Sequence, residues 1–130
     1  MTAALKDSGI VLFAHGARDP RWAAPFEAIA NQVRAGATGV AIELAFLEIM
    51  EPDLDTAIAR LVAGGCVRID VVPLFLGTGG HLRKDLPRLA EAARASHPAT
   101  DIRLHPAIGE DEGIAAAIAV AVLALAAVGE

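Results

Sequence analysis

The fold is decided by the stretch IVLFAHG at residues 10–16 and by a similar one, VVPLFLGTGGH, at residues 71–81. Each begins with a short apolar run and continues into a segment in which a histidine stands next to a glycine. Such runs are typical of strands covered on both faces, as in a parallel sheet between helical layers. Ligands of these sheets bind beyond the carboxyl ends of the strands. We therefore expect His15 and His81 to lie at one edge of the sheet.

Longer segments with helical spacing alternate with the predicted strands. Strands are expected at residues 10–14 and 40–46, within 67–76, and at 102–104. The expected helices run from Trp22 to before Gly36, from Pro52 to Gly64, from the residue after His81, and from near Glu110. This order predicts an α/β fold with a three-layer, four-stranded parallel doubly wound sheet and helices on both faces. Residues 1–130 are expected to form one domain.

Composition excludes several classes of function. The net charge is −5, which argues against a nucleic-acid binder because such proteins usually present a basic face. A single cysteine, Cys66, cannot form an internal disulfide, and we expect a small buried residue there. The apolar stretch 114–128 is shorter than the roughly 20 residues that span a bilayer. We expect a cytoplasmic protein without nucleic-acid or membrane partners.

The two strand-end histidines are the first candidates for chemistry. Imidazole is the commonest metal ligand and titrates near neutral pH. A single histidine at a strand end is more often a hydrogen-bonded structural residue, and a structural role is favoured for His105. Two at equivalent positions, each beside glycine, favour a shared site for His15 and His81. The sequence holds no HxxxH or CxxC pattern, so the fold itself must assemble any metal site.

Carboxylates and glycines add to this candidate site. Glu51 either caps the helix that Pro52 opens, or completes a His/His/Glu site or acts as a base. Glu48 better suits a supporting position behind such a site. The loop of residues 77–80 either allows a tight turn or holds an anion with its N–H groups. A set of basic residues surrounds the histidines and suits a polycarboxylate ligand: Arg18, Arg21, Arg83, Lys84 and Arg88.

Three stretches together resemble a known family. They are FAHGARDP at residues 13–20, AFLE at 45–48 running to Glu51 and Pro52, and VPLFL at 72–76 running through GGH at 79–81 to DLP at 85–87. In this order and spacing they resemble the class II tetrapyrrole chelatases. In particular, they resemble the short single-domain sirohydrochlorin cobaltochelatases of the CbiX/SirB family. The resemblance covers residues 9–128.

The resemblance implies roles for individual residues. His15 would bind the metal and accept a proton from the macrocycle, His81 would be the second metal ligand, and Glu51 would contact the substrate. Residues that would line the tetrapyrrole pocket with Glu51 are Leu76, Gly77, Thr78, Gly79, Gly80 and His81. Glu48 and Arg18 would support the site from behind. Ala17 departs from the serine usual in the family, and the histidine-rich stretch of some short archaeal members is absent.

The family inserts a divalent metal into sirohydrochlorin without ATP and without a tightly bound cofactor. Co²⁺ for cobalamin is the expected metal substrate, and Fe²⁺ for sirohaem or Ni²⁺ are the alternatives. A short member of the family implies a homodimer. Two interpretations of other classes stay open: a metal-binding or metal-delivery protein without turnover, and a small module that binds a phosphorylated metabolite through residues 77–80.

Overall fold

The computed structural model describes residues 6–127 of the chain. The elements alternate as the sequence predicts. In chain order they are β1 (Ser8–Ala14), η1 (Pro20–Ala23), α1 (Ala24–Gly36), β2 (Val40–Phe46), α2 (Leu54–Ala63), β3 (Arg68–Pro73), α3 (Gly80–Ser96), β4 (Asp101–Leu104), η2 (Ile108–Glu110) and α4 (Glu112–Leu125). Here η marks a short 3₁₀ helix.

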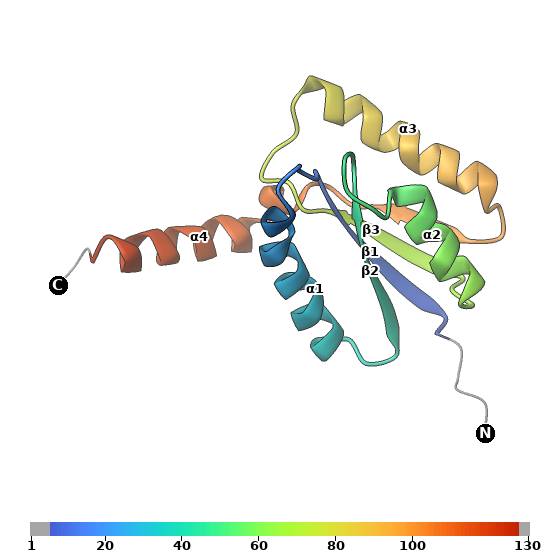
Figure 1. Cartoon of the computed structure of the whole chain (residues 1–130), viewed down its shortest axis with the longest axis horizontal. Helices are drawn as coiled ribbons and strands as arrows, with labels where there is room; N and C mark the ends of the chain where they lie inside the picture. The colour runs from blue at the N-terminus through green and yellow to red at the C-terminus, as the bar shows by residue number, and fades with distance from the viewer. Residues whose placement is uncertain (1–5, 128–130) are drawn as a thin grey trace.

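The four strands form one parallel sheet in the order β2-β1-β3-β4. The strand β1 lies between β2 and β3, so that Phe13 is level with both Ala45 and Pro73. Helices α2 and α3 cover one face, and α1 covers the other (Figure 1). This confirms the predicted α/β fold with helices on both faces.

The core divides between the two faces of the sheet. The larger cluster, between the sheet and helices α2 and α3, contains the fully buried side chains of Phe13, Ile58, Ile69 and Val71. On the α1 face, Leu12 packs with Ala30 and Ile42. Because side chains alternate along a strand, the central strand β1 contributes to both clusters. Its unbroken apolar run is therefore the sequence pattern of a strand buried on both faces.

The start of α2 corrects one prediction. Pro52 does not open this helix, and Glu51 does not cap it. The helix begins at Leu54, and Asp53 caps it by accepting a hydrogen bond from the Thr56 N–H at 2.8 Å. This bond holds the pKa of the Asp53 carboxyl below its usual value. Asp is a preferred capping residue because its side chain satisfies a helical N–H that has no partner within the helix.

Helix α3 begins slightly earlier than predicted. It spans Gly80–Ser96, so His81 lies in its first turn, and it continues through Pro87. Leu86, Ala90 and Ala93 are the buried side chains of this helix. Cys66 is also buried, as expected, and burial raises the pKa of its thiol.

The last helix has few contacts with the sheet. Asp111 caps α4 by accepting a hydrogen bond from the Gly113 N–H at 2.8 Å. From there the helix projects away from the other elements (Figure 1). Residues 115–127 are all exposed. Within residues 6–127, none of the helices combines the length and the apolar character needed to cross a bilayer.

A polar contact joins β3 to the residue that follows β4. The Asp70 carboxylate contacts the His105 ring nitrogen at 2.8 Å and Arg68 at 3.3 Å. Burial raises the pKa of Asp70, but the hydrogen bond to His105 and the charge of Arg68 outweigh it, so the pKa lies below its usual value. The contact agrees with the structural role predicted for His105.

We expect the substitution Asp70→Asn to lower the free energy of unfolding at neutral pH by about 1 kcal/mol. A depressed carboxyl pKa stabilises the folded state fully above the unfolded pKa, about 3.9, and less as the pH falls through the folded value. The difference between wild type and variant should therefore shrink as the pH is lowered from about 5, as followed by urea unfolding. Asp101→Asn, on an exposed pair of β4, is the control. A pH-independent difference would contradict this assignment.

Candidate functional site

The connections of the sheet change direction between β1 and β3. From β1 the chain passes through α1 to β2 on one side, whereas from β3 it passes through α3 to β4 on the other. The loops that leave these two adjacent strands therefore diverge. This is the topological switch point at which open α/β sheets bind ligands. The loop after β1 begins with His15, and the loop after β3 leads to His81.

The loops after β1 and β2 are held together through their backbones. The Leu47 N–H donates to the Ala14 carbonyl at 2.8 Å, and the Glu48 N–H donates to the His15 carbonyl at 3.0 Å. Gly16, with φ +99°, is essential to this contact, because a Cβ at this position would overlap the Glu48 carbonyl oxygen. The glycine after His15 thus fixes the backbone of the candidate ligand.

The loop after β3 supports the His15 ring. Phe75 is buried, and its ring lies 4.3 Å from that of His15, centroid to centroid, at an angle of 42°. The Phe75 ring also contacts Phe13 of β1, with centroids 6.2 Å apart. His15 itself is exposed. The imidazole therefore packs against an aromatic ring and is still accessible to a ligand.

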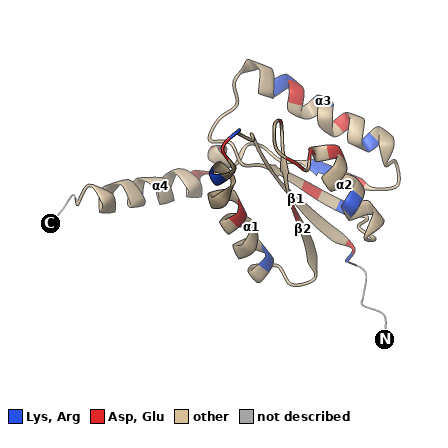
Figure 2. Ribbon diagram, in the orientation of Figure 1, with Lys and Arg blue, Asp and Glu red and all other residues tan. Residues whose placement is uncertain are grey.

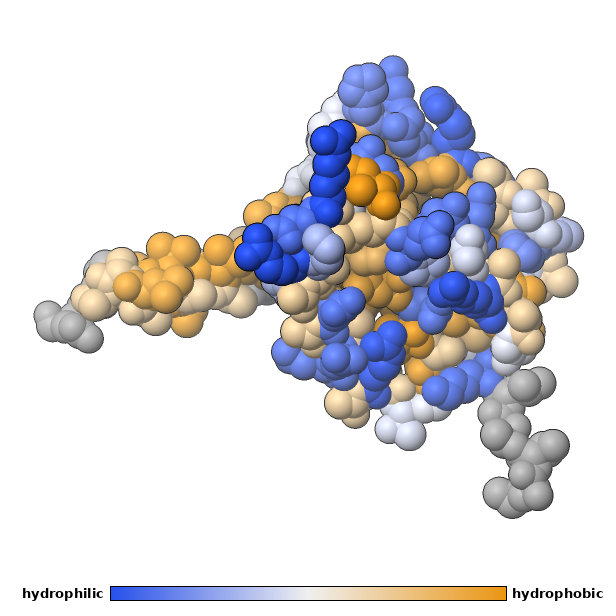
Figure 3. Space-filling view, viewed as in Figure 1, coloured by the Kyte–Doolittle hydropathy of each residue, from blue (hydrophilic) through white to orange (hydrophobic). Residues whose placement is uncertain are grey.

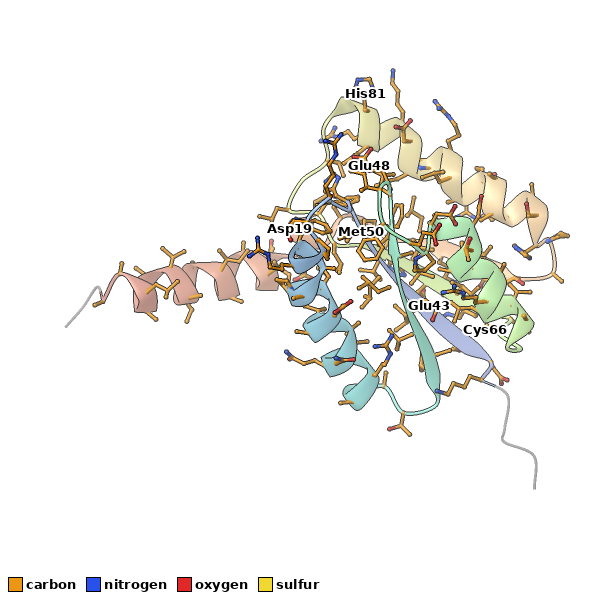
Figure 4. All side chains as sticks on the ribbon, in the orientation of Figure 1. Asp19, Glu43, Glu48, Met50, Cys66 and His81 are labelled. Carbon is orange, nitrogen blue, oxygen red and sulfur yellow. The ribbon has the colours of Figure 1, made fainter. Side chains whose placement is uncertain are left out.

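His81 lies at the same end of the sheet but farther out. It is exposed in the first turn of α3, and Figure 4 shows it at the outer end of that helix, beyond Glu48. Among residues 6–127, no three His, Cys, Asp or Glu side chains lie close enough together to hold a metal ion. The structure thus places both histidines at the predicted edge without assembling the His/His/Glu set that the sequence allows.

Glu51 and Arg18 line a common pocket. This pocket of about 370 Å³ lies between the loops after β1 and β2 and also contains Ala17 and Ile49. Ile49 is 62% exposed and has φ +70°, a region in which β-branched residues are rare. Strained backbone of this kind is often found at functional sites. The exposed Ile49 side chain gives the pocket an apolar rim next to the two charged groups.

The basic residues around the site fall into two groups. Arg21 pairs with Asp19 at 2.8 Å, and Arg88 pairs with Asp85 at 3.5 Å, so their charges are partly compensated. In the described part of the chain, Arg18, Arg83 and Lys84 form no ion pair. Figure 2 shows basic positions in the first turns of α3 and in the segment before α1. These three cations remain available to an anionic ligand.

Sequence reasoning missed two contributors to this site, Phe75 and Ile49. Phe75 stands in an apolar run, where an aromatic residue predicts core packing, and only the fold brings it beneath His15. Ile49 gives no signal, since a β-branched residue favours a strand rather than a left-handed turn. Gly16 was visible as a glycine next to His15, but its close approach to Glu48 depends on a contact distant in the sequence.

Comparison with known proteins gives a consistent result. The family model CbiX matches residues 9–124. The sirohydrochlorin cobaltochelatase of Saccharolobus solfataricus is 37% identical over 81 residues, which are 62% of this chain and 62% of that protein. That of Methanopyrus kandleri is 34% identical over 80 residues, 62% of this chain and 56% of that protein. The matches thus span less than two thirds of either relative.

Solved structures extend the similarity. The crystal structure of a CbiX protein from Marinobacter aquaeolei superposes with a TM-score of 0.79 at 40% identity, covering 88% of this chain and 93% of the other. The sirohydrochlorin chelatase SirB from Bacillus subtilis subspecies spizizenii, in complex with cobalt, gives a TM-score of 0.77 at 29% identity. That match covers 88% of this chain and 49% of SirB.

We expect Gly16→Ala to lower the free energy of unfolding by about 2–4 kcal/mol, since it adds a clash with the Glu48 carbonyl to the cost of a positive φ. Gly39→Ala is a matched control. Gly39 also has a positive φ, +84°, but nothing lies within 4 Å of its added Cβ, so about 1–2 kcal/mol is expected. Denaturant unfolding measures both. Equal losses would show that the approach of Gly16 to Glu48 is not a constraint.

Proposed function

The chain belongs to the CbiX family, and from this premise we propose that it inserts a divalent metal ion into sirohydrochlorin. The observation that carries the proposal is the position of His15: an exposed imidazole at the switch point of the sheet, supported by the Phe75 ring and fixed by the Glu48 backbone. The names of the relatives from Saccharolobus solfataricus and Methanopyrus kandleri support the same reaction.

The chemistry of metallation requires a base and a ligand in the same cleft. Two pyrrole protons must leave the ring while the ion enters it. A neutral imidazole can accept a proton from the macrocycle, and it is also a metal ligand. His15 is accessible for both tasks. Because Phe75 and the Glu48 N–H hold its ring and its backbone, little conformational freedom is lost when the substrate binds.

His81 would present or receive the metal at the rim of the cleft. A site that must release its ion into a macrocycle should not surround it with ligands, because a closed four-ligand set is the arrangement of structural metal sites. Two histidines without a third preassembled ligand in the described chain fit this requirement. Imidazole binds Co²⁺, Fe²⁺ and Ni²⁺ alike. We assign Co²⁺ as the metal substrate, with Fe²⁺ or Ni²⁺ as alternatives.

The rim of the cleft suits the carboxylates of sirohydrochlorin. Arg18, Arg83 and Lys84 can pair with side-chain carboxylates of the ring, as guanidinium and ammonium groups do. Glu51 shares a pocket with Arg18 and would help to remove protons at the ring edge. The segment of residues 76–81 would form the opposite wall, and Glu48 would support the loop after β1 through its hydrogen bond to the His15 carbonyl.

We also propose that the working enzyme is a homodimer. The 370 Å³ pocket beside Glu51 is too small for a whole tetrapyrrole, at the lower end of the volumes of small-ligand pockets. The chain corresponds to about half of SirB, since the match covers 49% of that protein. A second copy facing the first would supply the remaining wall of the cleft.

The second candidate is a protein that only binds or delivers metal. The small number of metal ligands at the site argues against this candidate. Storage or delivery requires enough ligands from this protein to hold the ion, and the described residues offer no such cluster. The two candidates differ in one measurement. The chelatase binds sirohydrochlorin without metal, whereas the delivery protein binds metal and not the macrocycle.

We expect His15→Ala and His81→Ala each to reduce metal insertion by at least about 100-fold, the usual loss when a positioned base or ligand is removed. Both side chains are exposed, so both variants should remain folded. The measurement is an anaerobic absorbance assay with sirohydrochlorin and Co²⁺, Fe²⁺ or Ni²⁺ in turn, against an enzyme-free control.

His97→Ala is the matched control for His81→Ala, because His97 lies at the opposite end of the same helix, α3. It should insert metal at the wild-type rate. Full activity of either site variant would show that the site is assigned wrongly. A different outcome is that the folded wild type accelerates the insertion of none of the three metals and binds metal but not sirohydrochlorin. That result would replace the chelatase function with the metal-delivery function.

A further inference from the structure

Ile49 has a backbone conformation that isoleucine rarely adopts. Its φ is +70°, and the Met50 N–H donates to the Glu48 carbonyl at 2.7 Å, which closes a three-residue γ-turn around Ile49. The form of this turn with a positive φ is rare and strained, and a β-branched side chain adds to the cost. Before α4, every other described residue with a positive φ is a glycine: Gly16, Gly39 and Gly65. A glycine would therefore suit the turn better than isoleucine does.

The Ile49 side chain contributes little to the core. It is 62% exposed, and the buried clusters of the described residues do not include it. Its neighbour Met50, in contrast, packs against the buried cluster around Phe46. In Figure 3 a strongly hydrophobic surface patch lies among hydrophilic side chains, at the place where Figure 1 shows the loop after β2. Strain of this kind, without packing inside the chain, indicates a contact with a bound molecule.

The turn at Ile49 is held in a fixed position relative to His15. The residue before it, Glu48, donates its N–H to the His15 carbonyl at 3.0 Å. Gly16 packs against the Glu48 carbonyl oxygen, which is also the oxygen that closes the turn. The backbones of the two loops therefore move together. A ligand that reaches the His15 imidazole lies next to the turn that carries Ile49.

The surroundings of Ile49 combine apolar and cationic groups. Ile49 lines the 370 Å³ pocket together with Arg18 and Glu51. Within residues 6–127 Arg18 forms no ion pair, so its guanidinium is available to a carboxylate. An exposed aliphatic side chain beside a free guanidinium matches a ligand with an apolar face and carboxylates at its edge. A flat tetrapyrrole with acidic side chains is such a ligand.

We propose that Ile49 packs against the face of the sirohydrochlorin ring beside His15. This inference rests on the proposed function and adds to it a residue that binds the apolar part of the substrate. The aliphatic side chain leaves water when the ring binds, which stabilises the complex. A glycine in the same turn would relieve the strain but could not make this contact. The side chain that binds the ring is thus the reason for a strained residue in this turn.

The first test is the substitution Ile49→Gly, measured for both stability and affinity. Glycine adopts a positive φ without strain, so the midpoint of thermal unfolding should rise by about 2–5 °C. The dissociation constant for metal-free sirohydrochlorin, from an anaerobic absorbance titration, should rise on the order of ten- to a hundredfold, because the aliphatic contact is lost. A side chain that served only the fold would give the opposite pair of results, a lower midpoint and unchanged affinity, and this would overturn the proposal.

Kinetics and a conservative variant add two further readouts. In the insertion assay Ile49→Gly should raise KM and leave kcat within about threefold, because the contact is the same in the ground state and the transition state. Ile49→Leu keeps an aliphatic side chain without a branch at Cβ, so its affinity should stay within about threefold of wild type. A loss of affinity in Ile49→Leu as large as that in Ile49→Gly would overturn the proposal.

Val67→Gly is the matched control. Val67 is also a β-branched residue with a high exposure, 60%, but it lies just before β3, at the end of the sheet opposite to His15. Its substitution should leave the affinity for sirohydrochlorin unchanged. The Ile49→Gly variant should also sediment as the wild type does. A changed oligomeric state would assign Ile49 to a contact between copies of the chain and would overturn the contact with the ring.

A failure of this inference can be distinguished from a failure of the proposed function. If the wild type inserts metal and Ile49→Gly binds sirohydrochlorin as tightly as the wild type, only the role of Ile49 is wrong. If the wild type binds sirohydrochlorin but inserts no metal, and the substitution weakens binding, metal insertion is wrong and the contact with the ring is supported. A wild type that does not bind sirohydrochlorin would overturn both.

Discussion

The structure depends on the position of β1 between two parallel neighbours. This strand pairs with β2 along one side and with β3 along the other, and it is buried on both faces. From Val11 to Ala14 every side chain is buried, so a polar side chain there would leave an unsatisfied group in the core. Its first polar residue past the strand end, His15, emerges where the two flanking connections diverge. The burial of β1 on both faces thus ends at the switch point, and His15 is the first side chain beyond it.

Most of the architecture could be predicted from local sequence patterns. The apolar runs and helical stripes indicate strands and helices correctly because each pattern reports which faces are buried. The predicted start of α2 was wrong because Pro52 is compatible with a first helical turn. Asp53 instead satisfies a free N–H, so the helix begins two residues later, at Leu54. Proline shows where a helix is permitted to begin, and the cap determines where it does begin.

The candidate site could be predicted only in part. His15 and His81 stand next to glycines at strand ends, and this placement can be read from the sequence alone. The stacking of Phe75 on His15 and the approach of Gly16 to Glu48 join segments far apart in the chain, so no local pattern contains them. The direction of α4 is similar. Its apolar composition predicts burial, whereas residues 115–127 are exposed in the structure.

Phe75 is where the separate parts of the molecule meet. Its ring supports His15, its carbonyl accepts the Gly109 N–H that anchors the base of α4, and its neighbour Leu76 lines an apolar groove on the α1 face of the sheet. A change in the packing of the groove therefore acts on the backbone of the residue that positions the imidazole. Closely packed interiors transmit such displacements because they have few voids to absorb them. In the proposed chelatase, a cleft that must hold a flat ring, accept its protons and then release the metallated product would gain from a ligand held in a fixed position. Phe75 holds the ring of His15, and the segment that leads to His81 continues directly from it through Leu76.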